Sequence, residues 1–203
     1  MDKIYLASAS PRRVELLKLL GIPFEQRISN VREQDSTAVE PGILTEDLAL
    51  AKARAVAGEV NTGFVVGADT IVVYRGEILG KPESREDAYA MLRLLSGREH
   101  LVITGVAVID AAGGRELSAH EITKVTFRFL TDYDICCYVD TGEPMDKAGG
   151  YGIQGVGGLL VKGISGCYNN VVGLPLTLLA ELLAKMGLDV WIYIGKGDGC
   201  GTS

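Results

Sequence analysis

The sequence predicts an α/β fold with a mixed sheet flanked by helices. Strand-like and helix-like segments alternate along the chain without internal repeats. Two apolar runs, 64–67 and 101–103, are typical of central strands that are buried on both faces. The run 121–129 alternates polar and apolar residues, which indicates a strand with one face toward solvent or a cleft. Together these patterns favour a partly antiparallel sheet.

Apolar periodicity and helix N-cap residues predict the individual helices and strands. Helices are expected at residues 11–20, 45–58, 84–96, 131–140 and 175–186. Strands are expected at 3–7, 64–67, 69–74, 77–79, 101–109, 119–129 and 158–162. Ser10 and Pro11 suit the N-cap and the first position of the first helix. Ser84 and Thr131 are each followed three residues later by Asp, which indicates a capping box.

Length and composition fit one sizeable domain. The 203 residues are 47% hydrophobic and 23% charged, which is ordinary for a protein with a full core. A net charge of -6 argues against a general nucleic-acid or membrane-surface binder, because such proteins carry positive excess. Without a signal peptide or a long apolar run, the protein is expected in the cytoplasm. Residues 1–188 should form one domain, and 189–203 a partly disordered tail.

The turn 8–13 places two arginines in the first turn of the first helix. Cations are unfavourable there, because the helix dipole is positive and unpaired N–H groups point outward. An anion between Arg12 and Arg13 would remove the conflict, and the hydroxyls of Ser8 and Ser10 add donors. The combination favours a phosphate site over a solvated pair of surface arginines.

Asp69 interrupts a long apolar run. A carboxylate in such a run is costly to bury unless it is paired or binds a metal. Its position suggests the end or a kink of a central strand, where α/β proteins place functional groups. Gly67 is expected to leave room for a ligand, and Thr70 adds a hydroxyl. The alternative is a turn aspartate that caps a neighbouring loop.

Four further residues remain ambiguous from the residues alone. Lys52 is either an exposed residue of an Ala-rich helix or a cation of the site, and Lys81 follows a strand-to-turn junction. Glu33 is either part of a solvated acidic loop or a metal ligand. Gln154 lies in the Gly-rich loop 142–155, and its amide could read a base edge or bond to nearby backbone.

Several separated motifs occur in the order typical of one family. They are SASPRR at 8–13, GADT at 67–70, GKP at 80–82, LSG at 95–97, EPMDKAG at 143–149 and VGLP at 172–175. Over about residues 3–187 the chain resembles the Maf family of nucleotide pyrophosphatases. The resemblance implies an elongated α/β fold with two lobes around a cleft, similar to inosine triphosphate pyrophosphatases. It also implies metal-dependent cleavage of nucleoside triphosphates to monophosphate and pyrophosphate by the domain 1–188.

The segment 152–155, GIQG, is similar to the branch that acts on dTTP and UTP, rather than the branch that prefers a 7-methylated guanine nucleotide. In that branch the residues matching Arg12, Thr70 and Gln154 are associated with base choice. The residue matching Asp69 is the proton acceptor. The substrates could extend to modified pyrimidine triphosphates, and the resemblance is compatible with a homodimer.

The resemblance suggests a division of roles. The residues expected to bind substrate are Ser8, Arg12, Arg13, Lys52, Thr70, Lys81 and Gln154. Mg²⁺ or Mn²⁺ is expected on Glu33 and Asp69. Asp69 could be the base, a metal ligand or both. Two other functions stay open: a regulatory protein that binds a nucleotide without turnover, and a phosphatase acting on small phosphate esters.

Overall fold

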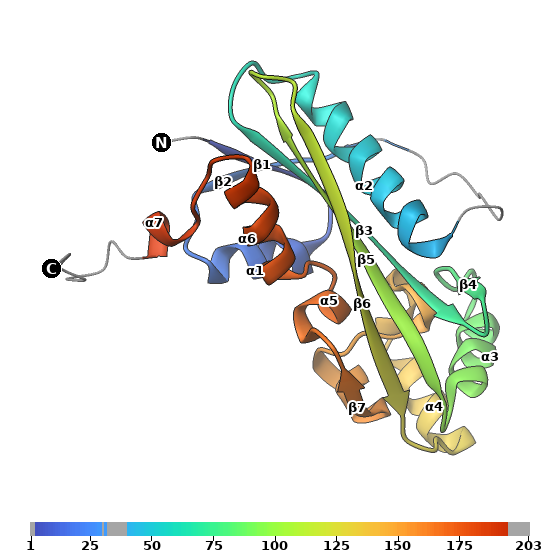
Figure 1. The fold of residues 1–203 in the computed structure, drawn as a ribbon. Coiled ribbons are helices and arrows are strands. Elements are labelled where there is room, and N and C mark those ends of the chain that lie inside the picture. Colours follow the sequence, from blue (N-terminus) through green and yellow to red (C-terminus); the bar gives the residue numbers. More distant parts are fainter. Residues whose placement is uncertain (1–2, 30, 32–39, 195–203) are drawn as a thin grey trace, which may run out of the picture.

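The computed structural model describes residues 3–29, 31 and 40–194. Over these residues seven strands form one sheet in the order β2-β1-β3-β5-β6-β7, and β4 pairs with β3 beside that path (Figure 1). The strands are β1 (Ile4–Ala7), β2 (Phe24–Arg27), β3 (Phe64–Tyr74), β4 (Glu77–Leu79), β5 (Glu99–Asp110), β6 (Glu116–Phe127) and β7 (Val161–Ser165). β1 is parallel to β2 and β3, and the other pairings are antiparallel, so the predicted mixed sheet is confirmed.

Helices cover both faces of this sheet. The α-helices are α1 (Pro11–Leu19), α2 (Pro41–Ala57), α3 (Arg85–Leu95), α4 (Asp132–Asp140), α5 (Tyr168–Val172), α6 (Leu176–Lys185) and α7 (Trp191–Ile194). Three 3₁₀ helices, η1 (Glu143–Asp146), η2 (Ala148–Gly150) and η3 (Gly155–Leu160), form most of the Gly-rich segment. α2 lies on one face, and α1, α5 and α6 lie on the other (Figure 1). None of the described helices is long and apolar enough to span a bilayer.

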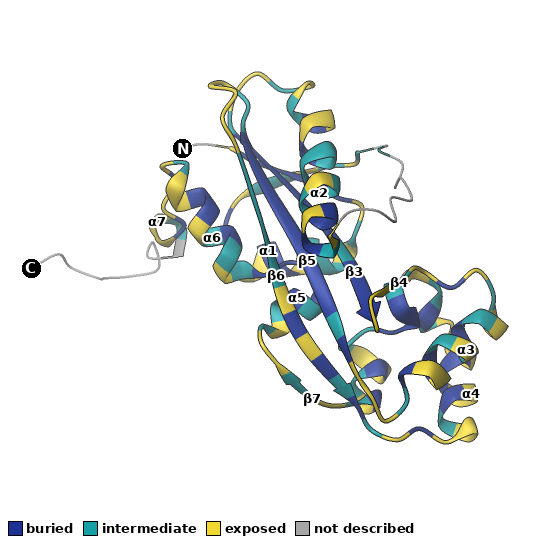
Figure 2. Cartoon of the chain, turned by 45° about the vertical axis from the view of Figure 1, so that its right-hand side comes forward, coloured by how far each residue is buried: buried dark blue, intermediate teal, exposed yellow. Residues whose placement is uncertain are grey.

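Two hydrophobic cores lie toward opposite ends of the long strands. The first packs β1, α1 and α6 against Val66 and Val108. The second packs α3 and α4 against Val72 and Val102, which lie farther along the same strands. β3 and β5 are buried along most of their length (Figure 2). The long strands therefore join two lobes, which confirms the elongated, two-lobed α/β fold.

α2 packs so closely against β3 and β5 that only glycine fits at two positions of these strands. A Cβ atom at Gly67 would lie 2.2 Å from the carbonyl oxygen of Ala49. A Cβ atom at Gly105 would lie 2.2 Å from the backbone of Thr45. Gly67 therefore makes room for α2, and the expectation that it leaves room for a ligand is wrong.

The predicted elements with clear end signals are confirmed. α1 begins at Pro11, and α4 has a complete capping box between Thr131 and Asp134. Ser84 caps α3 by accepting a hydrogen bond from the backbone of Asp87. α2 begins before the expected residue 45, at Pro41, with the Glu40 side chain accepting from the backbone in the first turn.

Other boundaries differ from expectation. β3 runs without a break through Ala68, because that residue continues the ladder with β5. Most of the expected strand 158–162 is η3, and β7 begins only at Val161. β2, α5 and α7 lie outside the predicted elements. Val190, in the expected tail, is buried in the first core.

Candidate active site

A pocket of about 450 Å³ opens at the edge of β3. β1 pairs with β3 only as far as Gly67, and β4 pairs with it only from Val72. Between these residues, no strand of the described chain pairs with this edge of β3. Asp69 and Thr70, which point to opposite faces, both line the pocket around the open edge. This is the type of site that α/β sheets provide beyond the ends of parallel strands.

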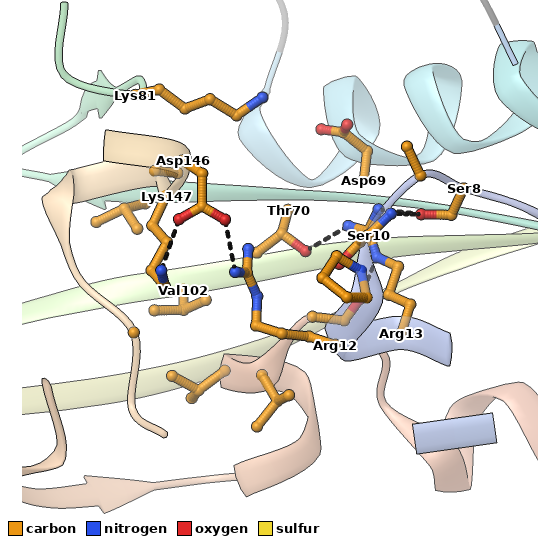
Figure 3. Close-up of a pocket in the computed structure, with 18 of the residues that line it drawn as sticks. Ser8, Ser10, Arg12, Arg13, Asp69, Thr70, Lys81, Val102, Asp146 and Lys147 are labelled. Carbon is orange, nitrogen blue, oxygen red and sulfur yellow. Dashed lines mark hydrogen bonds and ion pairs between the residues drawn. The ribbon is translucent and has the colours of Figure 1, made fainter. Parts of the chain in front are cut away.

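Residues from both lobes line this pocket, as Figure 3 shows. All but one of the predicted site residues are among them: Ser8, Arg12, Arg13, Lys52, Asp69, Thr70, Lys81 and Gln154. The exception, Glu33, lies outside the described residues. The structure therefore brings together groups that are up to 146 positions apart, from Ser8 to Gln154.

The turn before α1 is organised by Ser8 rather than by a side-chain cap. Ser10 occupies the N-cap position, but its side chain makes no capping hydrogen bond among the described residues. Its backbone N–H instead donates to Ser8 Oγ at 3.1 Å. No acidic residue lies in the first turn of α1. The helix start therefore keeps its positive character on the pocket wall.

Arg13 is held in place by three oxygen acceptors. Its Nε donates to the carbonyl oxygen of Gly173 at 2.7 Å, and its two terminal nitrogens donate to Ser8 Oγ at 3.3 Å and Thr70 Oγ1 at 3.0 Å. These contacts link α1, the loop after β1, β3 and the end of α5. A guanidinium fixed in this way is preorganised to bind an oxyanion.

Arg12 points across the pocket to the other lobe (Figure 3). Its Nη1 donates to Asp146 Oδ2 at 3.0 Å, and the other oxygen of that carboxylate accepts from Lys147 at 2.6 Å. The two arginines therefore have different surroundings. Asp146 was missed as a site residue, although it lies in the motif 143–149. The sequence around an exposed loop carboxylate gives no signal that it meets a distant arginine.

Asp69 forms an ion pair with Lys52 of α2. The Nζ–Oδ1 distance is 2.5 Å, and the side chains are 6% and 14% exposed for Asp69 and Lys52. Both side chains are largely shielded from water, so either charge alone would have a desolvation cost of several kcal/mol. The ion pair offsets part of that cost. The turn-capping alternative for Asp69 is wrong, since the residue lies within β3. Lys52 is part of the pocket wall rather than an exposed helix residue.

Lys81 and Gln154 complete the pocket from the second lobe. Lys81 follows β4 and extends along the rim of the pocket (Figure 3). Gln154 is the residue before η3, in an extended conformation. Its amide makes no hydrogen bond among the described residues, so the alternative of an amide tied to nearby backbone is not supported there. The side chain can thus meet a ligand with donor and acceptor together.

Glu143, another residue that sequence reasoning missed, anchors the loop that carries Gln154. Its Oε1 accepts hydrogen bonds from Tyr138 at 3.0 Å and from the backbone of Gly157 at 3.3 Å. The Tyr138 hydroxyl also accepts from the backbone of Gly152 at 3.3 Å. Burial raises the pKa of Tyr138 above its ordinary value, which keeps its hydroxyl protonated as a donor. These bonds hold the loop on both sides of Gln154.

Tyr151 in the pocket wall is hydrogen-bonded to the buried His100 behind it. The Tyr151 hydroxyl lies 2.7 Å from His100 Nε2. Burial lowers the pKa of His100 to about 4 and raises the pKa of Tyr151. Both groups are therefore neutral near pH 7. Charge in the pocket comes from the arginines, lysines and carboxylates.

Comparison with known proteins identifies the family to which the chain belongs. Residues 3–186 match the family model described as Maf-like protein. A dTTP/UTP pyrophosphatase of Moorella thermoacetica is 56% identical over 94% of this chain and 98% of the relative. The protein of the same name from Pelotomaculum thermopropionicum is 50% identical over 94% of this chain and 100% of the relative. The Staphylococcus aureus Ham1 structure aligns with TM-score 0.45 and 15% identity, covering 62% of this chain and 71% of that one. The chain belongs to the Maf family.

Proposed function

We propose that this protein hydrolyses dTTP and UTP, and modified pyrimidine triphosphates of similar shape, to nucleoside monophosphate and pyrophosphate. The observation that carries the proposal is the buried Asp69–Lys52 pair inside a pocket that also contains Arg12 and Arg13. A carboxylate repels phosphate, so its presence in a cationic pocket needs a chemical role. The two relatives, both named dTTP/UTP pyrophosphatase, support the same substrates.

The cations of the pocket suit a triphosphate. Arg13 and the start of α1 lie on one wall, while Lys81 extends from the other lobe. Lys52 lies beside Asp69, where the anhydride would be cleaved. We assign phosphate binding to these groups together with Ser8, because charge must be neutralised before a nucleophile can approach.

Asp69 is the proposed general base. It would accept a proton from a water whose oxygen attacks the α-phosphorus. The bond between that phosphorus and the bridging oxygen then breaks, and pyrophosphate leaves with the electron pair. Lys52 holds the carboxylate in place at 2.5 Å. The base acts chiefly through its position.

Mg²⁺ or Mn²⁺ is the proposed cofactor. The Asp69 carboxylate offers a pocket oxygen, and such ions favour one or two carboxylates plus substrate phosphates. Glu33, outside the described residues, is the second proposed ligand. The described residues contain no cluster of three His, Cys, Asp or Glu side chains able to hold a metal. A divalent ion on Asp69 and Glu33 would neutralise phosphate charge.

Base choice is assigned to Arg12, Thr70 and Gln154. Each lines the pocket, and they come from different elements: α1, β3 and the loop before η3. The Gln154 amide can donate to a ring carbonyl of uracil or thymine. The cytoplasmic location, the homodimer and the domain limit at residue 188 remain predictions.

The deciding experiment is product identification with a nucleotide panel. The purified chain is incubated with dTTP, UTP, CTP or GTP and Mg²⁺, and the products are separated. Pyrophosphate and monophosphate from dTTP and UTP are expected. Phosphate and diphosphate would instead indicate a phosphatase, and binding without products would indicate a regulatory nucleotide-binding protein. Asp69→Asn is the matched control for contaminating activity.

A further inference from the structure

A chain of hydrogen bonds runs from the pocket wall into the protein interior. Arg13 Nη2 donates to Thr70 Oγ1 at 3.0 Å, and Thr70 Oγ1 lies 3.0 Å from Thr104 Oγ1. Thr104 Oγ1 in turn donates to the backbone carbonyl oxygen of Asn170 at 3.0 Å. Thr70 and Thr104 face each other across β3 and β5. Thr104 is fully buried, while Thr70 lines the pocket.

The two ends of this chain determine the direction of its middle bond. A carbonyl oxygen only accepts, so the single hydroxyl hydrogen of Thr104 is used on Asn170. The bond between the two threonines therefore needs the hydrogen of Thr70. A guanidinium only donates, so Arg13 occupies one lone pair of the Thr70 oxygen. Thr70 has one lone pair left and no hydrogen to offer the pocket.

An oxygen of this kind discriminates between ligand atoms. It is unsuited to a phosphate oxygen, which is itself an acceptor, but it suits an N–H group. The N3 position of uracil and thymine carries a hydrogen, whereas N3 of cytosine is an acceptor. A hydrogen bond to the wrong partner leaves two lone pairs facing each other and costs about 1–3 kcal/mol, or about fivefold to a hundredfold in efficiency.

We propose that Thr104 is a positioning residue for base selection: it takes the Thr70 hydrogen, so that Thr70 presents an acceptor to the N3–H of the pyrimidine. This deepens the proposed function and rests on it. Thr104 itself lies behind Thr70 and outside the pocket lining. Its effect on the substrate passes through the orientation of one hydroxyl group.

The test replaces Thr104 by residues of similar shape. Thr104→Val removes the acceptor and frees the Thr70 hydrogen to turn toward the pocket. The ratio of kcat/KM for UTP to that for CTP should fall about tenfold. Thr104→Ser keeps the hydroxyl and should retain the wild-type ratio within about twofold.

Thr123→Val is the matched control. Thr123 is also a fully buried threonine that bonds to Asn170, at 2.9 Å, and accepts from the backbone of Cys167, but it has no hydrogen bond to Thr70. Loss of its hydroxyl should lower the melting temperature and leave the UTP-to-CTP ratio unchanged. An equal loss of ratio in both valine variants would overturn the proposal, because it would indicate general loosening of α5.

A second measurement uses the wild-type chain and does not depend on folding of a variant. UTP methylated at N3 should be used about tenfold less efficiently than UTP, because the methyl group removes the donor. Equal use of the two nucleotides would overturn the proposal. So would an equal fall for UTP and CTP in Thr104→Val, which would place a sugar hydroxyl at Thr70. Failure of the proposed function is distinct: wild type would release no pyrophosphate from any nucleotide.

Discussion

Asp69 and Thr70 are neighbours in β3, yet the two faces to which they point differ in chemistry. Asp69 points toward α2 and forms an ion pair with Lys52. Thr70 points toward α5 and joins Arg13 to the buried hydroxyl of Thr104. One face holds a charge pair, and the other holds a directed set of hydrogen bonds. Both reach one pocket because β3 has an open edge between β1 and β4.

Under the proposed function, one strand supplies both the general base and a base-selecting hydroxyl group. On the α2 face, Gly67 and Gly105 bring the helix backbone against the sheet, which fixes Lys52 beside the carboxylate. On the other face, the position of a hydrogen atom depends on a residue that never touches the pocket. We therefore expect changes on the α2 face to alter rate, and changes on the Thr70 face to alter preference.

The largest effect is expected from Asp69→Asn. The amide is isosteric but cannot accept the proton of the attacking water, so pyrophosphate release from dTTP should fall about a thousandfold. A stopped assay for pyrophosphate measures the rate, and circular dichroism checks that the variant is folded. Near-normal turnover in a folded variant would show that the charged face does not carry the reaction.

The pH dependence of the free energy of unfolding tests the buried His100 of β5, on the Thr70 face of the sheet. His100 has a folded pKa of about 4, while the unfolded chain has the ordinary value near 6.5. Below pH 6.5 the unfolded state binds a proton that the folded state does not bind, so stability falls as pH drops toward 4. The loss should reach about 3 kcal/mol.

Urea unfolding at several pH values measures that loss, with His100→Gln as the control. Gln stays neutral over this range and can still bond to Tyr151, so the variant should lack this part of the pH dependence. Carboxylates titrate in both proteins and cancel in the difference. Identical curves for the two proteins would contradict a buried, neutral His100.

Gly105→Ala tests the close contact on the α2 face. The added methyl group would lie 2.2 Å from the backbone of Thr45, so α2 must move. The free energy of unfolding should fall by about 2 kcal/mol. Gly163→Ala is the control, since a Cβ there meets nothing within 4 Å. Equal stability of the two variants would show that α2 yields easily and that the glycine contact is unimportant.

The smallest effect is expected from Gln154→Ala. The amide has no protein hydrogen bond to lose among the described residues, so the melting temperature should change little. The preference for UTP over GTP should fall about fivefold, which corresponds to one hydrogen bond. Competition assays with both nucleotides measure the ratio. An unchanged ratio would place base selection on Arg12 and Thr70.

Much of the secondary structure could be predicted from signals between residues close together in the sequence. Pro11 begins α1 and Thr131 caps α4 because these signals operate through residues one to three positions away. The apolar run around Asp69 likewise marked a buried carboxylate that lines the pocket and pairs with Lys52. The expected strand 158–162 is confirmed only at 161–162. Its other residues form η3, because an apolar run suits either structure and only packing distinguishes the two.

Arg12, Arg13 and Asp69 could be predicted as pocket residues because each has a chemically unusual position along the chain. Lys52, Lys81 and Gln154 stayed ambiguous until the family resemblance was added. The partners of all these groups depend on the tertiary structure. Asp146 meets Arg12 across 134 positions, and Thr104 meets Thr70 across 34. Gly67 serves α2 rather than a ligand because a helix from another part of the chain occupies that space. Helix caps and periodicity depend on neighbouring residues, whereas ion pairs and hydroxyl directions depend on which strands and helices meet.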